Sequence, residues 1–225
     1  MSRRLVVVTA GLSNPSTTSL VGERLADAVS TQVAGRGENV DVEYIELREL
    51  AVGLAHALTT GGLPDPALDE VKRRISSADG MIAVTPVFNA SYSGLFKTFF
   101  DVLDQDALVG MPVLIAATAG TPRHSLVLDY ALRPLFAYMR ATVLPTGVFA
   151  ATEDFGSADG ADLEQRINRA AAEMATALVS TRTGVEGLLQ EHLDQDGASG
   201  RSRDGVGLQP PVNDFAALLH GHDGS

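Results

Sequence analysis

The chain contains short continuous apolar runs that alternate with longer segments of mixed polarity. Three runs, at residues 4–10, 81–85 and 112–118, are rich in aliphatic residues and end at glycine, proline or small residues. Runs of this kind predict strands that are buried on both faces. Residues 40–47 instead alternate apolar and polar positions, which predicts a strand at the sheet edge, and a last strand is predicted over 142–149.

Between the predicted strands, apolar residues recur at helical spacing. Leu25, Ala28 and Val29 belong to one such stripe, and Pro66 suits the first position of a helix. Helices are predicted over residues 19–34, 66–78, 94–104, 126–140 (interrupted at Pro134) and 161–180. Residues 48–65 contain three glycines and a proline, so we expect a long irregular connection there.

The order of the predicted elements is a strand followed by a helix, repeated about five times. This pattern predicts an α/β fold in three layers, with helices on both sides of a parallel sheet. Five strands favour a flavodoxin-like, doubly wound sheet with the order 2-1-3-4-5. Ligands of such sheets bind at the carboxyl ends of the strands, so the loops after Ala10, Thr85 and Thr118 are the expected binding loops.

We expect residues 1–182 to form this domain and residues 183–225 to form a polar, partly disordered tail with a possible short helix at 212–220. In that helix Phe215, Leu218 and Leu219 would share a face. Two roles stay open for the tail, which are packing on the domain and binding a partner.

Composition narrows the classes of function. The 225 residues carry a formal net charge of -11, which argues against binding to nucleic acids or to anionic membranes. The chain has no cysteine, which excludes disulfides, thiol nucleophiles, cysteine-ligated zinc and iron–sulfur clusters. The apolar run after Arg3 and Arg4 is too short for a signal peptide, and no run approaches about 18 apolar residues. We therefore expect a soluble cytoplasmic protein.

The first binding loop, residues 11–19, joins a buried strand to a helix and is rich in hydroxyl residues. Free backbone N–H groups and the dipole at a helix start attract anions, and the hydroxyls add donors, so a phosphate monoester would fit. The loop has neither the Walker pattern nor Gly-x-Gly-x-x-Gly, which disfavours nucleoside triphosphate and Rossmann sites. The alternative is that residues 16–19 only cap the helix.

The other two loops offer surfaces for a flat ring. Phe88 and Tyr92 have flat faces, and Asn89 is both donor and acceptor, although a simple strand-to-helix turn is an alternative. After Thr118, small residues leave room for a ring. Arg123 and His124 would meet a phosphate or a nicotinamide nucleotide, with a backbone-bonded histidine near a helix start as the alternative for His124.

Two segments carry a resemblance to a known family. Residues 85–97 (TPVFNASYSGLFK) resemble the Pro-x-Tyr-Asn-x-Ser-x-x-Gly-x-Leu-Lys segment of the NADPH-dependent FMN reductase family. Residues 117–149 resemble that family's flavin reductases that serve two-component monooxygenases. The resemblance covers about residues 5–149, and it implies FMN with NADPH or NADH as the bound molecules.

The resemblance also implies roles for residues of the three loops. The FMN phosphate would be held by Ser13, Ser16, Thr17, Thr18 and Ser19. The isoalloxazine ring and ribityl chain would be lined by Pro86, Val87, Phe88, Asn89 and Ser91. The other ring edge would meet Thr118, Ala119, Gly120 and Thr121, and the nicotinamide nucleotide would meet Arg123 and His124.

This chain departs from the family pattern in two places. Many relatives have an arginine between the serines of the phosphate loop, whereas residues 14–17 contain no basic residue. Phosphate binding is therefore expected to rest on hydroxyls and backbone. Relatives commonly have tyrosine where Phe88 stands, so the hydrogen bond of that hydroxyl is lost. Both departures favour weak, exchangeable flavin binding.

The predicted reaction is hydride transfer from nicotinamide C4 to flavin N5, with reduced FMN passed to a flavin-dependent monooxygenase. The cofactor carries this chemistry, so we expect no catalytic acid or base and no metal. A homodimer or homotetramer is implied, with Tyr130 either at the subunit contact or in the core.

Three alternatives differ from this prediction. A quinone or azo reductase would retain its flavin. A non-enzymatic flavodoxin-like carrier would bind flavin without oxidising nicotinamide, but the signature Thr-x-Thr-Gly-x-Thr is missing. A hydrolase built on Ser125, His124 and Asp129 is disfavoured because no Gly-x-Ser-x-Gly elbow exists.

Overall fold

Seven strands form one sheet in the computed structural model, which describes residues 2–63, 65–155 and 160–180. The path across the sheet is β2-β1-β3-β5-β6, while β4 pairs with β3 and β7 pairs with β5. All pairings are parallel except that of β3 with β4. The strands are β1 (Ser2–Thr9), β2 (Asn39–Glu46), β3 (Gly80–Phe88), β4 (Ser91–Tyr92), β5 (Pro112–Ala119), β6 (Thr142–Val143) and β7 (Val148–Ala151).

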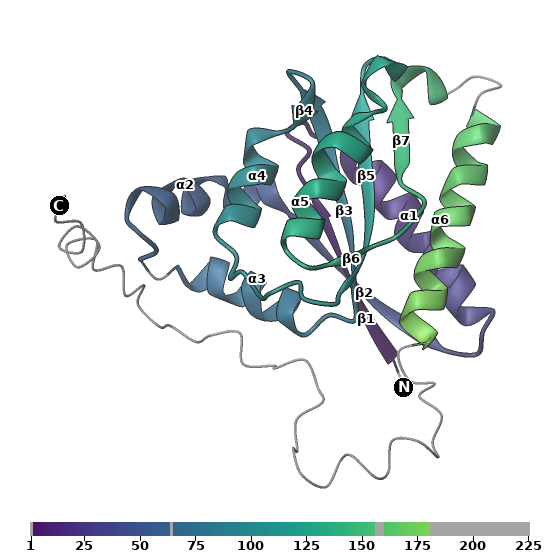
Figure 1. Ribbon diagram of the computed structural model, residues 1–225, viewed down its shortest axis with the longest axis horizontal. Coiled ribbons are helices and arrows are strands. Elements are labelled where there is room, and N and C mark those ends of the chain that lie inside the picture. Colours follow the sequence, from purple (N-terminus) through teal and green to yellow (C-terminus); the bar gives the residue numbers. More distant parts are fainter. Residues whose placement is uncertain (1, 64, 156–159, 181–225) are drawn as a thin grey trace, which may run out of the picture.

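Helices cover both faces of the sheet and complete three layers (Figure 1). On one face lie α1 and α6, and on the other lie α2, α3, α4 and α5. The helices are α1 (Thr17–Ala34), α2 (Ala51–Thr59), α3 (Pro66–Ser76), α4 (Gly94–Asp101), α5 (Arg133–Tyr138) and α6 (Gly160–Ser180). Short helical turns are η1 (Leu47–Leu50), η2 (Pro122–His124), η3 (Leu128–Leu132) and η4 (Thr152–Asp154).

The middle parts of the central strands are apolar at every position because both of their faces are buried. Val6 and Val8 of β1 belong to the core on the α2–α5 side, while Leu5 and Val7 belong to the core beneath α1 and α6. The predicted α/β fold with a doubly wound parallel sheet is thereby confirmed. The edge position predicted for residues 40–47 is also confirmed, since β2 ends the path.

The prediction of only five strands in the order 2-1-3-4-5 is wrong, because the sheet has seven strands and its path is 2-1-3-5-6. The short β4 turns back on β3, and the strand predicted over 142–149 is divided into β6 and β7. Pro145 has no N–H to donate to a sheet, and it lies in the gap between the two pieces. Arg133 donates hydrogen bonds to the carbonyl oxygens of Leu144 and Pro145 at 3.0 and 3.1 Å, which satisfies backbone groups at this break.

The irregular connection predicted over residues 48–65 is wrong for residues 48–59, which belong to η1 and α2. Leu54 and Ala57 give α2 a buried face despite the glycine at position 53. A Cβ on Gly53 would lie 2.6 Å from the Asp65 carboxylate, which caps α3 by accepting hydrogen bonds from the backbone N–H groups of Ala67 and Leu68. The glycine therefore gives this capping carboxylate room.

Other element bounds differ from the prediction. The helix predicted over 126–140 is a π turn, η3, followed by α5, and Pro134 occupies the first turn of α5 instead of breaking it. The N–H of Arg133 bonds to the carbonyl of Leu128, five residues back. Pro86 does not end β3, which continues to Phe88 because its end pairs with β4. The predicted tail 183–225, with its helix at 212–220, lies outside the described residues, so the domain boundary stays a prediction.

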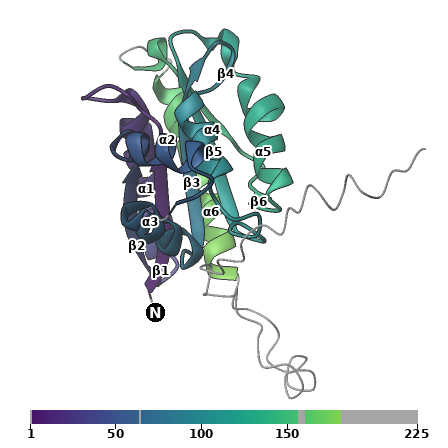
Figure 2. The ribbon, with the colours of Figure 1, turned by 90° about the vertical axis from the view of Figure 1, so that its left-hand side faces the viewer.

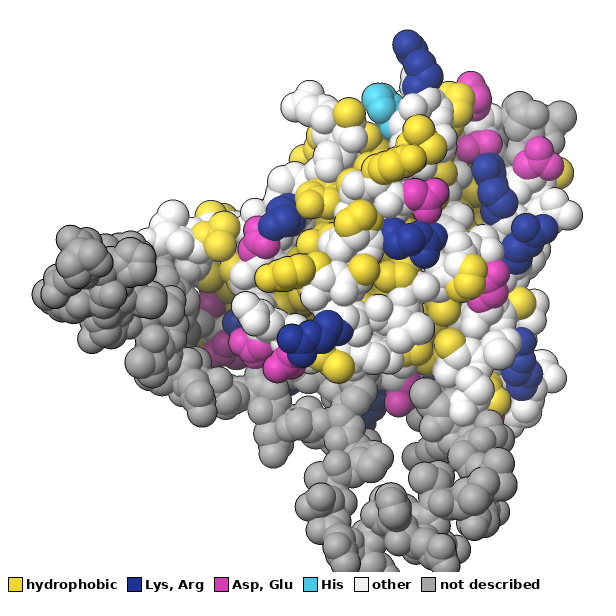
Figure 3. Space-filling view, viewed as in Figure 1, with side chains coloured by type: hydrophobic (Ala, Val, Ile, Leu, Met, Phe, Trp, Pro, Cys, Tyr) yellow, Lys and Arg dark blue, Asp and Glu magenta, His cyan; other side chains and the backbone are white. Residues whose placement is uncertain are grey.

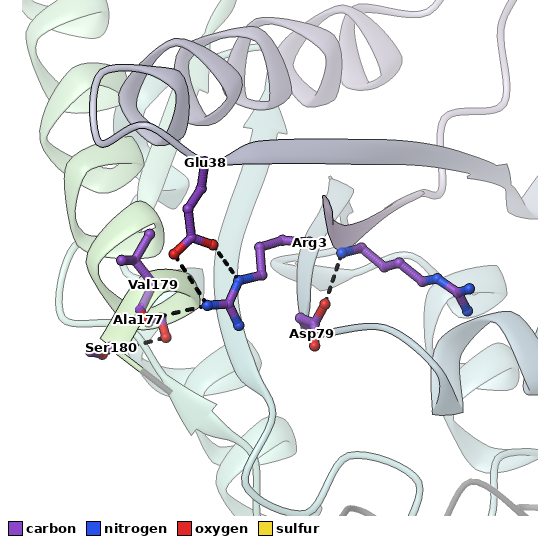
Figure 4. Close-up of polar contacts among 7 residues, drawn as sticks. Arg3, Glu38, Asp79, Ala177, Val179 and Ser180 are labelled. Atoms are coloured by element: carbon purple, nitrogen blue, oxygen red, sulfur yellow. Dashed lines mark hydrogen bonds and ion pairs between the residues drawn. The ribbon is translucent and has the colours of Figure 1, made fainter. Parts of the chain in front are cut away.

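No helix among residues 2–63, 65–155 and 160–180 has the length and apolar character needed to cross a membrane. Arg3 and Arg4, the two arginines before the first apolar run, lie at the start of β1. Figure 4 shows Arg3 between Glu38 and the end of α6. Its Nε donates to Glu38 at 2.7 Å, and its Nη2 donates to the carbonyl of Val179 at 3.4 Å. The bond to Glu38 raises the pKa of the Arg3 guanidinium above its ordinary value, against the effect of burial, so Arg3 stays charged.

Replacing Arg3 with methionine is expected to lower the free energy of unfolding by about 1–3 kcal/mol, because charge-assisted hydrogen bonds at a mostly buried site are lost. Urea denaturation measures this difference. Arg4→Met is the matched control, because the Arg4 side chain is exposed and its bonds to Asp79 are made by its backbone N–H and carbonyl groups. Equal losses in the two variants would contradict the role given to Arg3.

Candidate functional site

The three loops singled out in the sequence lie at one edge of the sheet. Because β1, β3 and β5 are parallel neighbours, their carboxyl ends point the same way. The loops that follow these strands lie at the upper end of the molecule in Figure 2. Topology therefore brings together residues 11–16, 86–93 and 120–125, which are far apart in the sequence.

Buried hydroxyl residues mark this edge. Apart from Arg3, the buried polar side chains within the described residues belong to Thr9, Thr18, Thr85, Ser93 and Thr118. The Thr18 and Thr118 hydroxyl oxygens are 2.9 Å apart and share a buried hydrogen bond. This bond ties the first turn of α1 to the end of β5, and so fixes the first loop relative to the third.

The first loop ends in a capped helix. The Ser16 hydroxyl accepts a hydrogen bond from the backbone N–H of Ser19 at 3.2 Å, so Ser16 is the N-cap of α1. The Ser19 hydroxyl lies 3.4 Å from that of Thr9, whereas Ser13 and Thr17 are exposed. The remaining free N–H groups of this 18-residue helix and the exposed hydroxyls are donors of the kind that bind anions at helix starts.

The second loop is a hairpin whose base is held by a hydrogen bond to Thr85 of β3. Val87 pairs with Tyr92, and the connection passes through Asn89 and Ala90 with φ of 49° and 66°. Successive positive φ values are typical of the type I′ turn, which asparagine tolerates better than most residues. The backbone N–H of Ser93 donates to the Thr85 hydroxyl at 3.1 Å, and Phe88 at the tip is 46% exposed. This arrangement presents an aromatic ring and an amide to solvent.

The third loop combines open space with an unpaired hydroxyl. A Cβ placed on Gly120 would have no heavy atom within 4 Å. The Thr121 hydroxyl is buried, yet it has no hydrogen-bond partner among the described residues. Arg123 and His124 follow on η2, and both are exposed. An unpaired buried hydroxyl is costly, so its presence beside open space is typical of a site that receives a polar ligand.

These observations fit a phosphorylated flat ring such as FMN. The first loop has the donors for a dianionic phosphate, and the second and third loops leave room and polar groups for a ring. The predicted residues thus lie on three loops at one edge. The Thr18 and Thr118 hydroxyls pair with each other and the Ser16 hydroxyl accepts from a backbone N–H, while Thr121 keeps an unused donor.

Four residues of this edge are not among the site residues predicted from the sequence. Thr9 and Thr85 are the last polar residues of apolar strands, which is a signal that sequence reasoning can use, and Ser93 caps α4. Arg48 lies on η1, and its Nη1 donates to the carbonyl oxygen of Ser13 at 3.2 Å. No local pattern connects Arg48 to a loop 35 residues away.

Replacing Thr118 with valine is expected to cost about 1–3 kcal/mol of unfolding free energy, because the Thr18 hydroxyl is left buried without a partner. Valine has nearly the same shape, so the loss reports the hydrogen bond. The double variant Thr18→Val/Thr118→Val should be more stable than Thr118→Val alone, since no buried polar group remains. Urea denaturation of all three variants tests this, and strictly additive losses would contradict the pairing.

Comparison with known proteins places the chain among flavin reductases. The sequence model of the NADPH-dependent FMN reductase family matches residues 3–156. The NADH-dependent FMN reductase SfnE of Pseudomonas putida is 40% identical over 176 residues, which are 77% of this chain and 91% of SfnE. An FMN reductase (NADPH) of Pseudomonas aeruginosa is 39% identical over 182 residues, or 80% of this chain and 94% of that protein.

A solved structure agrees with these relatives. The X-ray structure of an oxidoreductase from Corynebacterium diphtheriae is 55% identical, with a TM-score of 0.77, and the match covers 80% of this chain and 98% of that one. The family match spans all three loops of the candidate site. The chain therefore belongs to the NADPH-dependent FMN reductase family.

Proposed function

We propose that this chain transfers hydride from NADPH or NADH to FMN and releases the reduced FMN to a flavin-dependent monooxygenase. As a member of its family, the chain is an oxidoreductase that uses FMN with NAD(P)H. The observation that carries the proposal is the family match over residues 3–156, which contains the three loops that meet at the carboxyl edge of the sheet. Release to a monooxygenase is supported by the exposed, hydroxyl-based phosphate loop.

In this proposal each loop holds one part of FMN. The phosphate is bound by the start of α1 and its loop, through Ser13, Ser16, Thr17, Thr18 and Ser19. The ring and ribityl chain lie along Pro86, Val87, Phe88, Asn89 and Ser91. The opposite ring edge lies against Thr118, Ala119, Gly120 and Thr121, where the unpaired Thr121 hydroxyl has a donor to give.

The protein's share of the reaction is positioning. Bound FMN supplies the ring nitrogen that accepts the hydride, and no side chain of the loops has to move a proton in that step. The loops hold the flavin so that the nicotinamide can stack on it at reaction distance. Arg123 and His124 are exposed on η2 beside this site, and we assign them to the phosphates of the nicotinamide nucleotide. The named relatives include both an NADH- and an NADPH-dependent reductase, so both nucleotides belong in the assay.

The proposal includes assembly into a homodimer or homotetramer. It also includes a cytoplasmic location, where reduced nicotinamide nucleotides are made. Figure 3 shows apolar side chains over α4 and α5 on one face of the molecule. Tyr130 of η3 and Tyr138 of α5 are both 79% exposed, and Leu126 is 61% exposed. Exposed apolar groups on neighbouring elements are typical of contact surfaces, and light scattering of the purified protein tests the expected assembly.

The test of the reaction uses the purified chain, free FMN and either nucleotide. Oxidation of NADPH or NADH, followed at the nicotinamide absorbance, is expected to rise with free FMN and to saturate. Gel filtration is expected to separate the protein from most of its flavin. A rate that does not respond to added FMN, with flavin retained on the column, would favour a quinone or azo reductase. A flavin-loaded protein that oxidises neither nucleotide would favour an electron carrier.

A further inference from the structure

The phosphate loop of this chain has no cation of its own, but a distant arginine reaches it. Arg48 lies on η1, directly after β2. Because β2 pairs in parallel with β1, with Glu46 opposite Thr9, the segment after β2 lies beside the loop after β1. The Arg48 guanidinium donates from Nη1 to the carbonyl oxygen of Ser13, at 3.2 Å. The fold thus places a positive charge at a loop that the sequence leaves neutral.

The guanidinium is held from two sides and keeps donors free for a third contact. Its Nη2 lies 2.6 Å from Glu46 Oε2, and both side chains are about a third exposed, at 29% and 31%. Glu46 and Ser13 orient the group, and these two contacts use only part of the five N–H donors that a guanidinium carries. A planar guanidinium is suited to binding phosphate oxygens by paired hydrogen bonds.

We propose that Arg48 is the phosphate-recognition residue of this chain, and that it selects FMN over the unphosphorylated flavin. The inference rests on the proposed function, because it assumes that the loop at Ser13 receives the FMN phosphate. The positive charge replaces the arginine that is missing from residues 14–17. Since the charge lies on η1 and is shared with Glu46, the phosphate is held less firmly than by an unpaired arginine within the loop.

The experiment compares dissociation constants for FMN and riboflavin, measured by flavin fluorescence titration of the full chain. Arg48→Gln keeps an amide that can donate to the Ser13 carbonyl but removes the charge. It is expected to weaken FMN binding by about ten- to a hundredfold and to change riboflavin binding by less than about twofold. Glu46→Gln releases the guanidinium from its carboxylate and is expected to leave FMN binding equal or tighter.

Arg74→Gln is the matched control. Arg74 forms the same kind of pair with Glu43 of β2, at a similar exposure of 30% and 38%, and it donates to the carbonyl of Tyr44 instead of the loop. Its replacement is expected to leave the ratio of FMN to riboflavin affinity unchanged.

The inference would be overturned if Arg48→Gln weakened FMN and riboflavin binding equally, or weakened neither. Neither result would contradict the proposed FMN reduction. Arg48→Lys keeps a charge without the planar fork, and it should restore part of the FMN preference. A wild-type chain that binds neither flavin would overturn the proposed function together with this inference.

Discussion

Replacing Gly11 with alanine is expected to lower the free energy of unfolding by about 2–4 kcal/mol and to weaken FMN binding at least about tenfold. A Cβ at this position would lie 1.9 Å from the Ser16 hydroxyl oxygen, 3.0 Å from the Ser16 Cβ and 3.2 Å from the Thr18 Cβ. Rotating the serine side chain removes the 1.9 Å contact but leaves the Cβ contacts of 3.0 and 3.2 Å, which are tighter than ordinary packing. The rotation also breaks the hydrogen bond that caps α1. The loop must therefore shift, and the free N–H groups proposed for the phosphate shift with it.

A second substitution tests this explanation. In Gly11→Ala/Ser16→Gly both close Ser16 atoms are absent, and glycine at an N-cap costs only a few tenths of a kcal/mol relative to serine. The double variant is therefore expected to be more stable than Gly11→Ala, as measured by urea denaturation, and to regain the part of the FMN affinity that does not depend on the Ser16 hydroxyl. Were Gly11→Ala to melt and bind FMN like the wild type, the close packing of Gly11 on Ser16 would be refuted.

Most of the sheet could be predicted from sequence because two-sided burial leaves a local signature. In the central parts of β1, β3 and β5, at residues 5–8, 81–84 and 112–117, every position is buried, so these parts are apolar without alternation. At the edge, β2 has one less buried face and alternates accordingly. These patterns require no knowledge of distant residues.

The errors arose where a distant partner decides the local structure. Glycine at position 53 suggested an irregular segment, yet its lack of a Cβ makes room for the cap of another helix. The break between β6 and β7 has carbonyl groups that are satisfied by Arg133, a residue of α5. The sequence around Asp65 does not indicate that it lies beside Gly53. The sequence around Arg133 does not indicate that it bonds to the carbonyl groups of residues 144 and 145.

The candidate site shows the same division. Strand order alone places the three loops together, so the loops could be predicted from the sequence. The bond between Thr18 and Thr118 joins residues 100 positions apart, and the contact of Arg48 with Ser13 joins residues 35 positions apart. The first depends on how α1 packs against β5 and the second on the pairing of β1 with β2, and no single segment reveals either.

Replacing Gly120 with valine is expected to weaken FMN binding by about ten- to a hundredfold. The unfolding free energy of the flavin-free protein is expected to stay within about 0.5 kcal/mol of the wild-type value. Gly120 is exposed, and its Cβ would meet no heavy atom within 4 Å, so the protein itself has room for the larger side chain. If that room belongs to the flavin ring, the valine methyl groups occupy it. Gly120→Ala should give an intermediate loss.

The control is Gly35→Ala at the end of α1, where a Cβ makes ordinary contacts of 3.5 and 3.6 Å with backbone oxygens. It should change neither stability nor FMN binding appreciably. Riboflavin carries the same ring as FMN, so Gly120→Val should weaken both flavins equally, whereas loss of the Arg48 charge should weaken only FMN. If Gly120→Val binds FMN like the wild type, the third loop does not contact the flavin ring. The proposed FMN reduction would still stand in that case.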